Sequence, residues 1–214
     1  MYFKDRQDAG HQLAAKLMKY KNQLDCLILG LPRGGVVTAA EVASQLHLPL
    51  DIICARKVGA PHNPELAIGA VTETGEGYFN QDLIDYLRVT AGFLKTAIEV
   101  EKQEAQRRLK IYRQNRPSLV LENKTLILID DGMATGATMK AAIRSVKASG
   151  AAKIIVAVPI SAHETFEEVK QEVDDCISLD IPVPFYAVGE FYQNFSQTTD
   201  EEVIELLSLH GMNS

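Results

Sequence analysis

Two adjacent carboxylates follow the most strand-like run of the chain. Residues 126–129 are four consecutive apolar residues, and Asp130 and Asp131 come directly after them. Such a run is typical of a buried parallel strand, and open α/β sheets bind their ligands at the carboxyl ends of these strands. Paired carboxylates at that place accept hydrogen bonds from sugar hydroxyls or hold hydrated Mg²⁺. The acidic pair is therefore the first candidate for a functional site.

A loop of small residues follows the acidic pair and leads into a predicted helix over residues 138–149. Such a loop exposes backbone N–H groups, and the helix dipole favours an anion there. Single Asp and Thr residues at these places are also common as helix caps, which explains one residue of each kind but not the whole run. The run therefore predicts a phosphate cradle beside two carboxylates. The cradle residues are Gly132, Met133, Ala134, Thr135, Gly136, Ala137 and Thr138.

Basic residues follow two further predicted strands. The strand over residues 26–30 precedes a turn with Arg33, Gly34 and Gly35. The glycines allow the backbone to approach an anion closely, and the arginine offers a forked donor to phosphate oxygens. Arg56 and Lys57 follow the strand over residues 50–55. The alternative for residues 33–35 is an ordinary tight turn, and the alternative for Arg56 and Lys57 is a solvated basic pair at the end of a strand.

The elements that must position these residues alternate between strands and helices. Alternation of this kind predicts βαβ units, and hence an α/β fold with a doubly wound, mostly parallel sheet. Without repeats or linkers, residues 1–214 form a single domain, with a small hood from parts of 60–116 and 180–196. The further predicted strands cover 67–71, 124–129, 153–158 and 176–179, and the helices cover 8–19, 36–46, 93–112, 164–173 and 201–209.

Composition excludes several classes of protein. The 214 residues carry a formal net charge of −6, which argues against general nucleic-acid binding. No apolar run approaches the roughly 20 residues of a membrane span, and the first residues are too polar for a signal peptide. Cys26, Cys54 and Cys176 are isolated in the sequence, which favours reduced thiols. We therefore expect a cytoplasmic protein without membrane contact.

The combined pattern resembles the type I phosphoribosyltransferase family. Residues 126–138 are similar to its motif for 5-phosphoribosyl 1-pyrophosphate (PRPP), although Gly132 stands where a branched apolar residue is usual. Residues 32–35 resemble the family's pyrophosphate loop, and residues 55–59 resemble a basic segment of its adenine and orotate enzymes. The resemblance runs from about residue 26 to residue 195. It is strongest to a branch of predicted phosphoribosyltransferases without an established substrate.

This resemblance implies a Rossmann-like fold and a role for each motif. Asp130 and Asp131 would hold the ribose hydroxyls, directly or through Mg²⁺-bound water, and would be the metal residues. The loop over residues 134–138 would hold the 5′-phosphate. Arg33, Arg56 and Lys57 would contact the pyrophosphate, with Gly34 and Gly35 allowing its approach. The implied catalytic residues are Asp130, Asp131, Lys57 and Arg33, and the family habit implies a homodimer.

The acceptor site is the part of the chain that departs from the family. Tyr186, Phe185 and Val188 fall where purine enzymes hold the base, although these aromatics also suit a small core that ties the tail to the sheet. Ala134 stands where hypoxanthine-guanine enzymes carry a catalytic Asp. The lysine that reads oxopurines is absent near residues 156–159, which argues against guanine, hypoxanthine and xanthine. The candidates for a general base are instead Glu65, Glu73 and Glu190, which fall near the predicted site loops.

The expected activity is transfer of the phosphoribosyl group from PRPP to a small-molecule acceptor, a nitrogenous base in our interpretation, with release of pyrophosphate. Two alternatives stay open: a non-catalytic PRPP sensor that regulates a partner, and a Mg²⁺-dependent phosphohydrolase. The long charged helix over residues 93–112 also has two interpretations. It either packs on a sheet edge or partner, or covers the site and reaches the substrate through Arg107, Arg108 or Arg113.

Overall fold

A five-stranded parallel sheet forms the centre of the protein. The computed structural model describes residues 2–114, 116–117 and 120–210. Within these ranges the strand order is β2-β1-β6-β7-β8, and all neighbours run parallel. The strands are β1 (Cys26–Gly30), β2 (Leu50–Ile52), β6 (Thr125–Ile129), β7 (Lys153–Ile160) and β8 (Asp175–Asp180). The α/β fold predicted from the sequence is confirmed.

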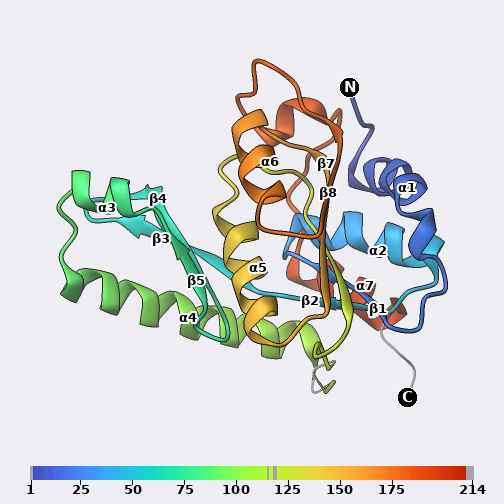
Figure 1. Cartoon of the computed structure of the whole chain (residues 1–214), viewed down its shortest axis with the longest axis horizontal. Helices are drawn as coiled ribbons and strands as arrows, with labels where there is room; N and C mark the ends of the chain where they lie inside the picture. The colour runs from blue at the N-terminus through green and yellow to red at the C-terminus, as the bar shows by residue number, and fades with distance from the viewer. Residues whose placement is uncertain (1, 115, 118–119, 211–214) are drawn as a thin grey trace.

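Helices cover both faces of this sheet (Figure 1). The side chains of Ile127 and Ile129 pack with the helices of one face, whereas those of Leu126 and Leu128 pack with the helices of the other. This alternation explains why the strands are apolar throughout, since both faces are buried. One face carries α1 (Arg6–Lys16), α2 (Gly34–Leu46) and α7 (Asp200–His210), and the other carries α5 (Ala137–Ala148) and α6 (His163–Lys170).

A second, antiparallel sheet forms an arm that extends from the parallel sheet (Figure 1). Its strands are β3 (Ala55–Ala60), β4 (Asn63–Thr72) and β5 (Gly77–Phe79), and α3 (Gln81–Tyr86) and α4 (Ala91–Arg113) complete the arm. Of the predicted strand over residues 50–55, only residues 50–52 form β2, and Ala55 already begins β3; the predicted strand over 67–71 is part of β4. The Ile53 N–H still donates to the Gly30 carbonyl, but the Cys54 N–H donates to the Glu73 carboxylate, so the chain leaves the parallel sheet between β2 and β3.

Helix α4 is packed along its length in two different environments. Leu94, Ala97 and Ile98 lie on the core of the arm, while Ala105 and Tyr112 are buried against the parallel-sheet body. Its three arginines are engaged with carboxylates: Arg113 with Asp51 at 2.7 Å, and Arg107 and Arg108 with Glu104 at 2.7 and 2.8 Å. The packed interpretation of this helix is therefore the observed one. Neither α4 nor any other helix in the described ranges combines the length and apolar character that a bilayer span requires.

An aromatic cluster joins the N-terminal residue Phe3 to the segment over residues 185–192 beside β7. The Phe3 and Tyr192 rings lie 5.3 Å apart, and Phe185 stacks on Phe191 at 5.4 Å. Short 3-10 helices, η1 (Met18–Tyr20) and η2 (Val188–Phe191), follow α1 and precede Tyr192. The segment around residues 185–192 thus forms the small aromatic core that was one of the two interpretations of these residues.

Candidate functional site

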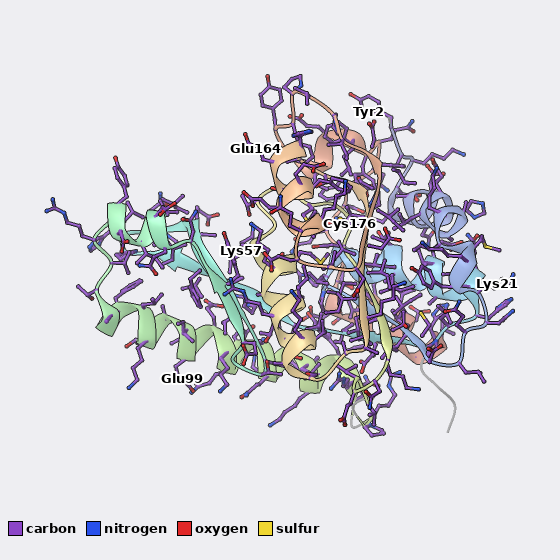
Figure 2. All side chains as sticks on the ribbon, viewed as in Figure 1. Tyr2, Lys21, Lys57, Glu99, Glu164 and Cys176 are labelled. Atoms are coloured by element: carbon purple, nitrogen blue, oxygen red, sulfur yellow. The ribbon has the colours of Figure 1, made fainter. Side chains whose placement is uncertain are left out.

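A cavity of about 280 Å³ opens at the carboxyl end of β6. It brings together the acidic pair, most of the small-residue loop and a basic residue from the arm. Figure 2 shows this basic residue, Lys57, at the junction between the arm and the parallel-sheet body. Ala137 of the predicted cradle is buried against Ala70 of β4 instead. The cavity is lined by Lys57, Asp130, Asp131, Gly132, Met133, Ala134, Thr135, Gly136, Thr138, Met139, Val188 and Phe195.

Strand β7 and helix α6 fix the small-residue loop. The Met133 N–H donates to the Ile160 carbonyl, and the Thr165 hydroxyl donates to the Ala134 carbonyl. Gly136 has a φ of +69°, and a Cβ there would lie 2.6 Å from the Thr165 methyl group. Only glycine fits this left-handed, crowded position. The loop is therefore rigidly placed at the N-terminus of α5, where the helix dipole favours an anion.

Gly132 departs from the family pattern for a steric reason. A Cβ at this position would lie 2.4 Å from Val188 Cγ1 and 2.7 Å from Ile160 Cγ2. The space that a branched side chain would need is already filled by Val188, which lies in the segment over residues 180–196 that is called the hood from here on. The departure therefore reflects how closely the hood packs on the strand end.

Asp130 is the more unusual of the two carboxylates. It is partly buried and lines the cavity, and its Oδ1 accepts a hydrogen bond from the Asp131 N–H at 2.9 Å. Burial, and then the negative charge of Asp131, raise the pKa of Asp130 well above its usual range, while the positive charge of Arg6 opposes this. Asp130 therefore holds a proton more readily than an ordinary aspartate.

Asp131 is paired with Arg6, a residue that no sequence motif indicated. Arg6 Nε lies 2.6 Å from Asp131 Oδ2, and the two side chains are only 11% and 15% exposed. Arg6 also donates from Nη1 to the Ser196 carbonyl at 2.7 Å and lies 3.9 Å over the Phe195 ring. A single arginine 125 residues away in a polar segment gave no signal in the sequence.

The Arg-Gly-Gly turn lies directly against the acidic pair. A Cβ at Gly34 would lie 2.0 Å from Asp131 Oδ2, and one at Gly35 would lie 2.7 Å from Asp130 Oδ1. The sequence predicted that these glycines allow close approach of an anion. The anionic groups that they approach in the structure are the two carboxylates themselves.

Of the three basic residues predicted to bind pyrophosphate, only Lys57 lines the cavity. Arg33 Nη1 lies 3.5 Å from Asp200 Oδ1 on α7, and Arg56 Nε lies 2.9 Å from Glu101 Oε2 on α4, so neither lines the cavity. Arg56 and Lys57 are neighbours in strand β3, where successive side chains point to opposite faces. Lys57 is exposed and has no carboxylate oxygen within 4.0 Å in the described part of the chain. It is thus the uncompensated cation of the cavity.

The candidate acceptor residues are also separated. Val188 lines the cavity, but Tyr186 is 75% exposed and Phe185 stacks within the aromatic cluster. The aromatic side chain at the cavity is Phe195, which stood in the same aromatic tail but was not singled out. A Cβ at Gly189 would lie 2.9 Å from Phe195 Cδ1, so this glycine lets the ring pack on η2.

The remaining candidate bases do not reach the cavity. Glu65 and Glu190 are exposed. The Glu73 carboxylate accepts a hydrogen bond at 3.0 Å from the N–H of Cys54, which lies in the connection between β2 and β3.

Two of the cysteines are poor nucleophiles. Burial raises the pKa of the Cys26 thiol to about 11 and that of the Cys176 thiol to about 12, which disfavours the reactive thiolate.

The donor set of the cavity suits Mg²⁺ that is shared with a substrate. Carboxylate oxygens are ligands that Mg²⁺ prefers, but Arg6 already engages Asp131 Oδ2 and the Asp131 N–H engages Asp130 Oδ1. Across residues 2–114, 116–117 and 120–210, no cluster of three or more His, Cys, Asp or Glu side chains has a metal-binding arrangement. Asp130 and Asp131 therefore fit a cation that keeps water or takes substrate oxygens as its other ligands.

Comparison with known proteins agrees with this geometry. Residues 4–193 match the model of the phosphoribosyl transferase domain. Two Mycobacterium tuberculosis proteins, from strains CDC 1551 and H37Rv, each named "Putative phosphoribosyl transferase", are 40% identical over 205 residues. These cover 96% of this chain but 46% of theirs, so the chain spans about half the length of these relatives. The crystal structure of TT1426 from Thermus thermophilus is 38% identical, with a TM-score of 0.83 and coverage of 99% of this chain and 100% of that one. The chain belongs to the phosphoribosyltransferase family.

Proposed function

We propose that this protein binds PRPP and transfers its phosphoribosyl group to a nitrogenous base, with release of pyrophosphate. One observation carries the proposal. A single cavity combines two carboxylates, a small-residue loop at the N-terminus of a 12-residue helix, and the exposed amine of Lys57. These groups suit the three parts of PRPP, namely its ribose hydroxyls, its 5′-phosphate and its pyrophosphate.

The acidic pair would orient the ribose. Asp130 and Asp131 accept hydrogen bonds from hydroxyls, and carboxylate oxygens form strong, charge-assisted bonds of this kind. The loop over residues 134–138 would bind the 5′-phosphate through backbone N–H groups and the hydroxyls of Thr135 and Thr138. Holding both ends of the sugar fixes the carbon at which the bond to pyrophosphate breaks.

The basic residues would bind the pyrophosphate. Lys57 is available without breaking an ion pair in the described structure. Arg33 is paired with Asp200 at 3.5 Å, but both side chains are about a third exposed, and such pairs contribute only about 0–1 kcal/mol. A pyrophosphate group with its higher charge would therefore compete for Arg33. When bound at the acidic pair, Mg²⁺ would supply further charge neutralisation for the leaving group.

The acceptor would lie against the apolar part of the cavity. Met133, Met139, Val188 and Phe195 line it, and apolar and aromatic side chains suit a planar heterocycle. Val188 and Phe195 belong to the hood, so the acceptor would enter between the hood and the sugar site.

The proposed function is tested by thermal unfolding with Mg²⁺ alone, with Mg²⁺ and PRPP, and with Mg²⁺ and ribose 5-phosphate. A ligand at 100 times its Kd stabilises by about 2.7 kcal/mol, which for this chain length corresponds to a rise of roughly 5–10 °C. We expect this rise with PRPP and its loss in the Asp130→Asn/Asp131→Asn variant. An unchanged melting temperature at millimolar PRPP, or a shift that survives in the variant, would contradict the proposal.

The second candidate function, a non-catalytic PRPP sensor, is favoured by the position of Ala134. Apart from Lys57 and the acidic pair, no titratable side chain is among the residues that line the cavity. Pyrophosphate release in the presence of a panel of bases separates the two functions. In an enzyme, Lys57→Ala would reduce turnover far more than PRPP affinity. A sensor would bind PRPP and release no pyrophosphate with any base.

A further inference from the structure

The first residues of the chain are built into the hood. The Phe3 N–H donates to the Phe191 carbonyl, and the Gln193 N–H donates back to the Phe3 carbonyl, both at 2.8 Å. The Asn194 N–H donates to the Lys4 carbonyl at 2.9 Å. Residues 3–4 therefore run beside residues 191–194, and helix α1 begins where this pairing ends.

Arg6 occupies an electrostatically unfavourable place in α1. It is the first residue of the helix, directly after the N-cap Asp5, whose side chain accepts the Asp8 N–H. The positive end of a helix dipole disfavours a cation. The placement of Arg6 is stabilised instead by the ion pair with Asp131 and by the cation–π contact with Phe195.

Arg6 joins three parts of the candidate site. Its guanidinium holds one oxygen of Asp131, donates to the Ser196 carbonyl, and covers the ring of Phe195. The Tyr192 hydroxyl donates to the Asp131 carbonyl, so the hood also holds the backbone of this aspartate. Asp131 and Phe195, which line the same cavity, are thus connected through a single, largely buried side chain.

We propose that Arg6 is a positioning residue of the site. It fixes the carboxylate of Asp131 toward the ribose, and it sets the spacing between this carboxylate and the hood wall at Phe195. Arg6 touches neither the reacting atoms nor the substrate in this role. The inference rests on the proposed function, because the Asp131 carboxylate matters through its contact with the sugar.

The test compares the PRPP-induced shift in melting temperature among Arg6 variants of the full chain. Arg6→Ala leaves Asp131 without its partner, and we expect at least about tenfold weaker PRPP binding, the factor that corresponds to a lost hydrogen bond between charged groups. At a PRPP concentration of 100 times the wild-type Kd, the shift then falls to about half or less. Arg6→Lys keeps the charge without the fork and should restore part of the shift. Methylguanidine added to Arg6→Ala should do the same.

A matched control is Arg144→Ala, which removes an arginine that lies 5.2 Å over Tyr78, outside the cavity. This variant should keep the full shift. If Arg6→Ala melts lower without ligand but keeps the full PRPP shift, Arg6 is merely structural and the inference is overturned. If Arg6→Ala does not fold, the same comparison with Arg6→Lys decides the question. A wild-type protein that shows no PRPP shift overturns the proposed function and this inference with it.

Discussion

At the scale of single residues, the site depends on glycines that leave room for carboxylates. Gly34 and Gly35 begin α2, while Asp130 and Asp131 follow β6, and the two segments touch only because neither glycine has a side chain. Atoms closer than about 3 Å to a new Cβ must move. In the protein without ligand, the Arg-Gly-Gly turn therefore already has a structural role: it lets α2 pack directly on the two carboxylates.

Gly34→Ala tests this contact. The new methyl group would lie 2.0 Å from Asp131 Oδ2 and 2.6 Å from Arg6 Nε, so it must displace their ion pair. We expect a loss of about 1–3 kcal/mol in unfolding free energy, as for other overpacked sites, together with a smaller PRPP shift. Chemical denaturation measures the first effect and thermal unfolding with PRPP the second.

The control for this substitution is Gly92→Ala in α4, where a Cβ meets no atom within 4 Å. This variant should keep its stability or gain up to about 1 kcal/mol, because alanine favours the helix. Equal effects of the two substitutions would show that the crowding at Gly34 is unimportant.

At the scale of elements, the arm is attached to the body through Glu73 at the end of β4. Its carboxylate accepts the Cys54 N–H, and its carbonyl accepts a bond from the Gln106 side chain of α4. Burial raises the pKa of Glu73, while hydrogen bonds from its own and the Cys54 backbone oppose this. This glutamate was a candidate base in the sequence, and its position makes it a junction residue instead.

The raised pKa of Glu73 predicts that Glu73→Gln increases the unfolding free energy by an amount that depends on pH. A carboxyl whose pKa is higher in the folded state favours folding below its unfolded pKa of about 4.3 and loses this contribution as pH rises through the folded value. Glutamine keeps an acceptor for the Cys54 N–H without titrating. The variant should therefore gain stability relative to wild type as pH increases from about 4 to 8.

Urea unfolding at several pH values measures this difference. The exposed Glu99→Gln on α4 provides a control, for which we expect a change within about 0.5 kcal/mol at each pH. A Glu73→Gln difference that stays constant across this pH range would contradict the prediction.

The elements that the sequence predicted best are those with a local signal. Strands β1, β6 and β7 are continuous apolar runs, and the acidic pair follows one of them directly. Strands β3 and β5 lack such runs: β3 holds Arg56, Lys57 and Gly59, and β5 has three residues. The contact of Arg6 with Asp131 and the exposure of Tyr186 result from the tertiary path of the chain, which no local pattern specifies.

At the scale of the whole molecule, the C-terminal helix connects the arm to the Arg-Gly-Gly turn. Asp200, the first residue of α7, accepts a hydrogen bond from the buried Tyr112 hydroxyl at 2.7 Å and lies 3.5 Å from Arg33 Nη1. Tyr112 belongs to α4 and Arg33 to the turn before α2. The Asp200 carboxylate therefore connects elements that are far apart in the sequence. It also pairs with Arg33, the arginine that the proposed function assigns to pyrophosphate.

Asp200→Asn separates these two roles. Asparagine keeps an oxygen acceptor for Tyr112 but removes the negative charge beside Arg33. We expect a stability close to that of wild type and up to about fivefold tighter binding of inorganic pyrophosphate with Mg²⁺, since a partly exposed ion pair contributes at most about 1 kcal/mol. Tyr112→Phe is the matched variant: it should cost about 1 kcal/mol of unfolding free energy and leave pyrophosphate affinity unchanged. Calorimetric titration with pyrophosphate decides the matter, because equal affinities of wild type and Asp200→Asn would mean that Asp200 does not compete for Arg33.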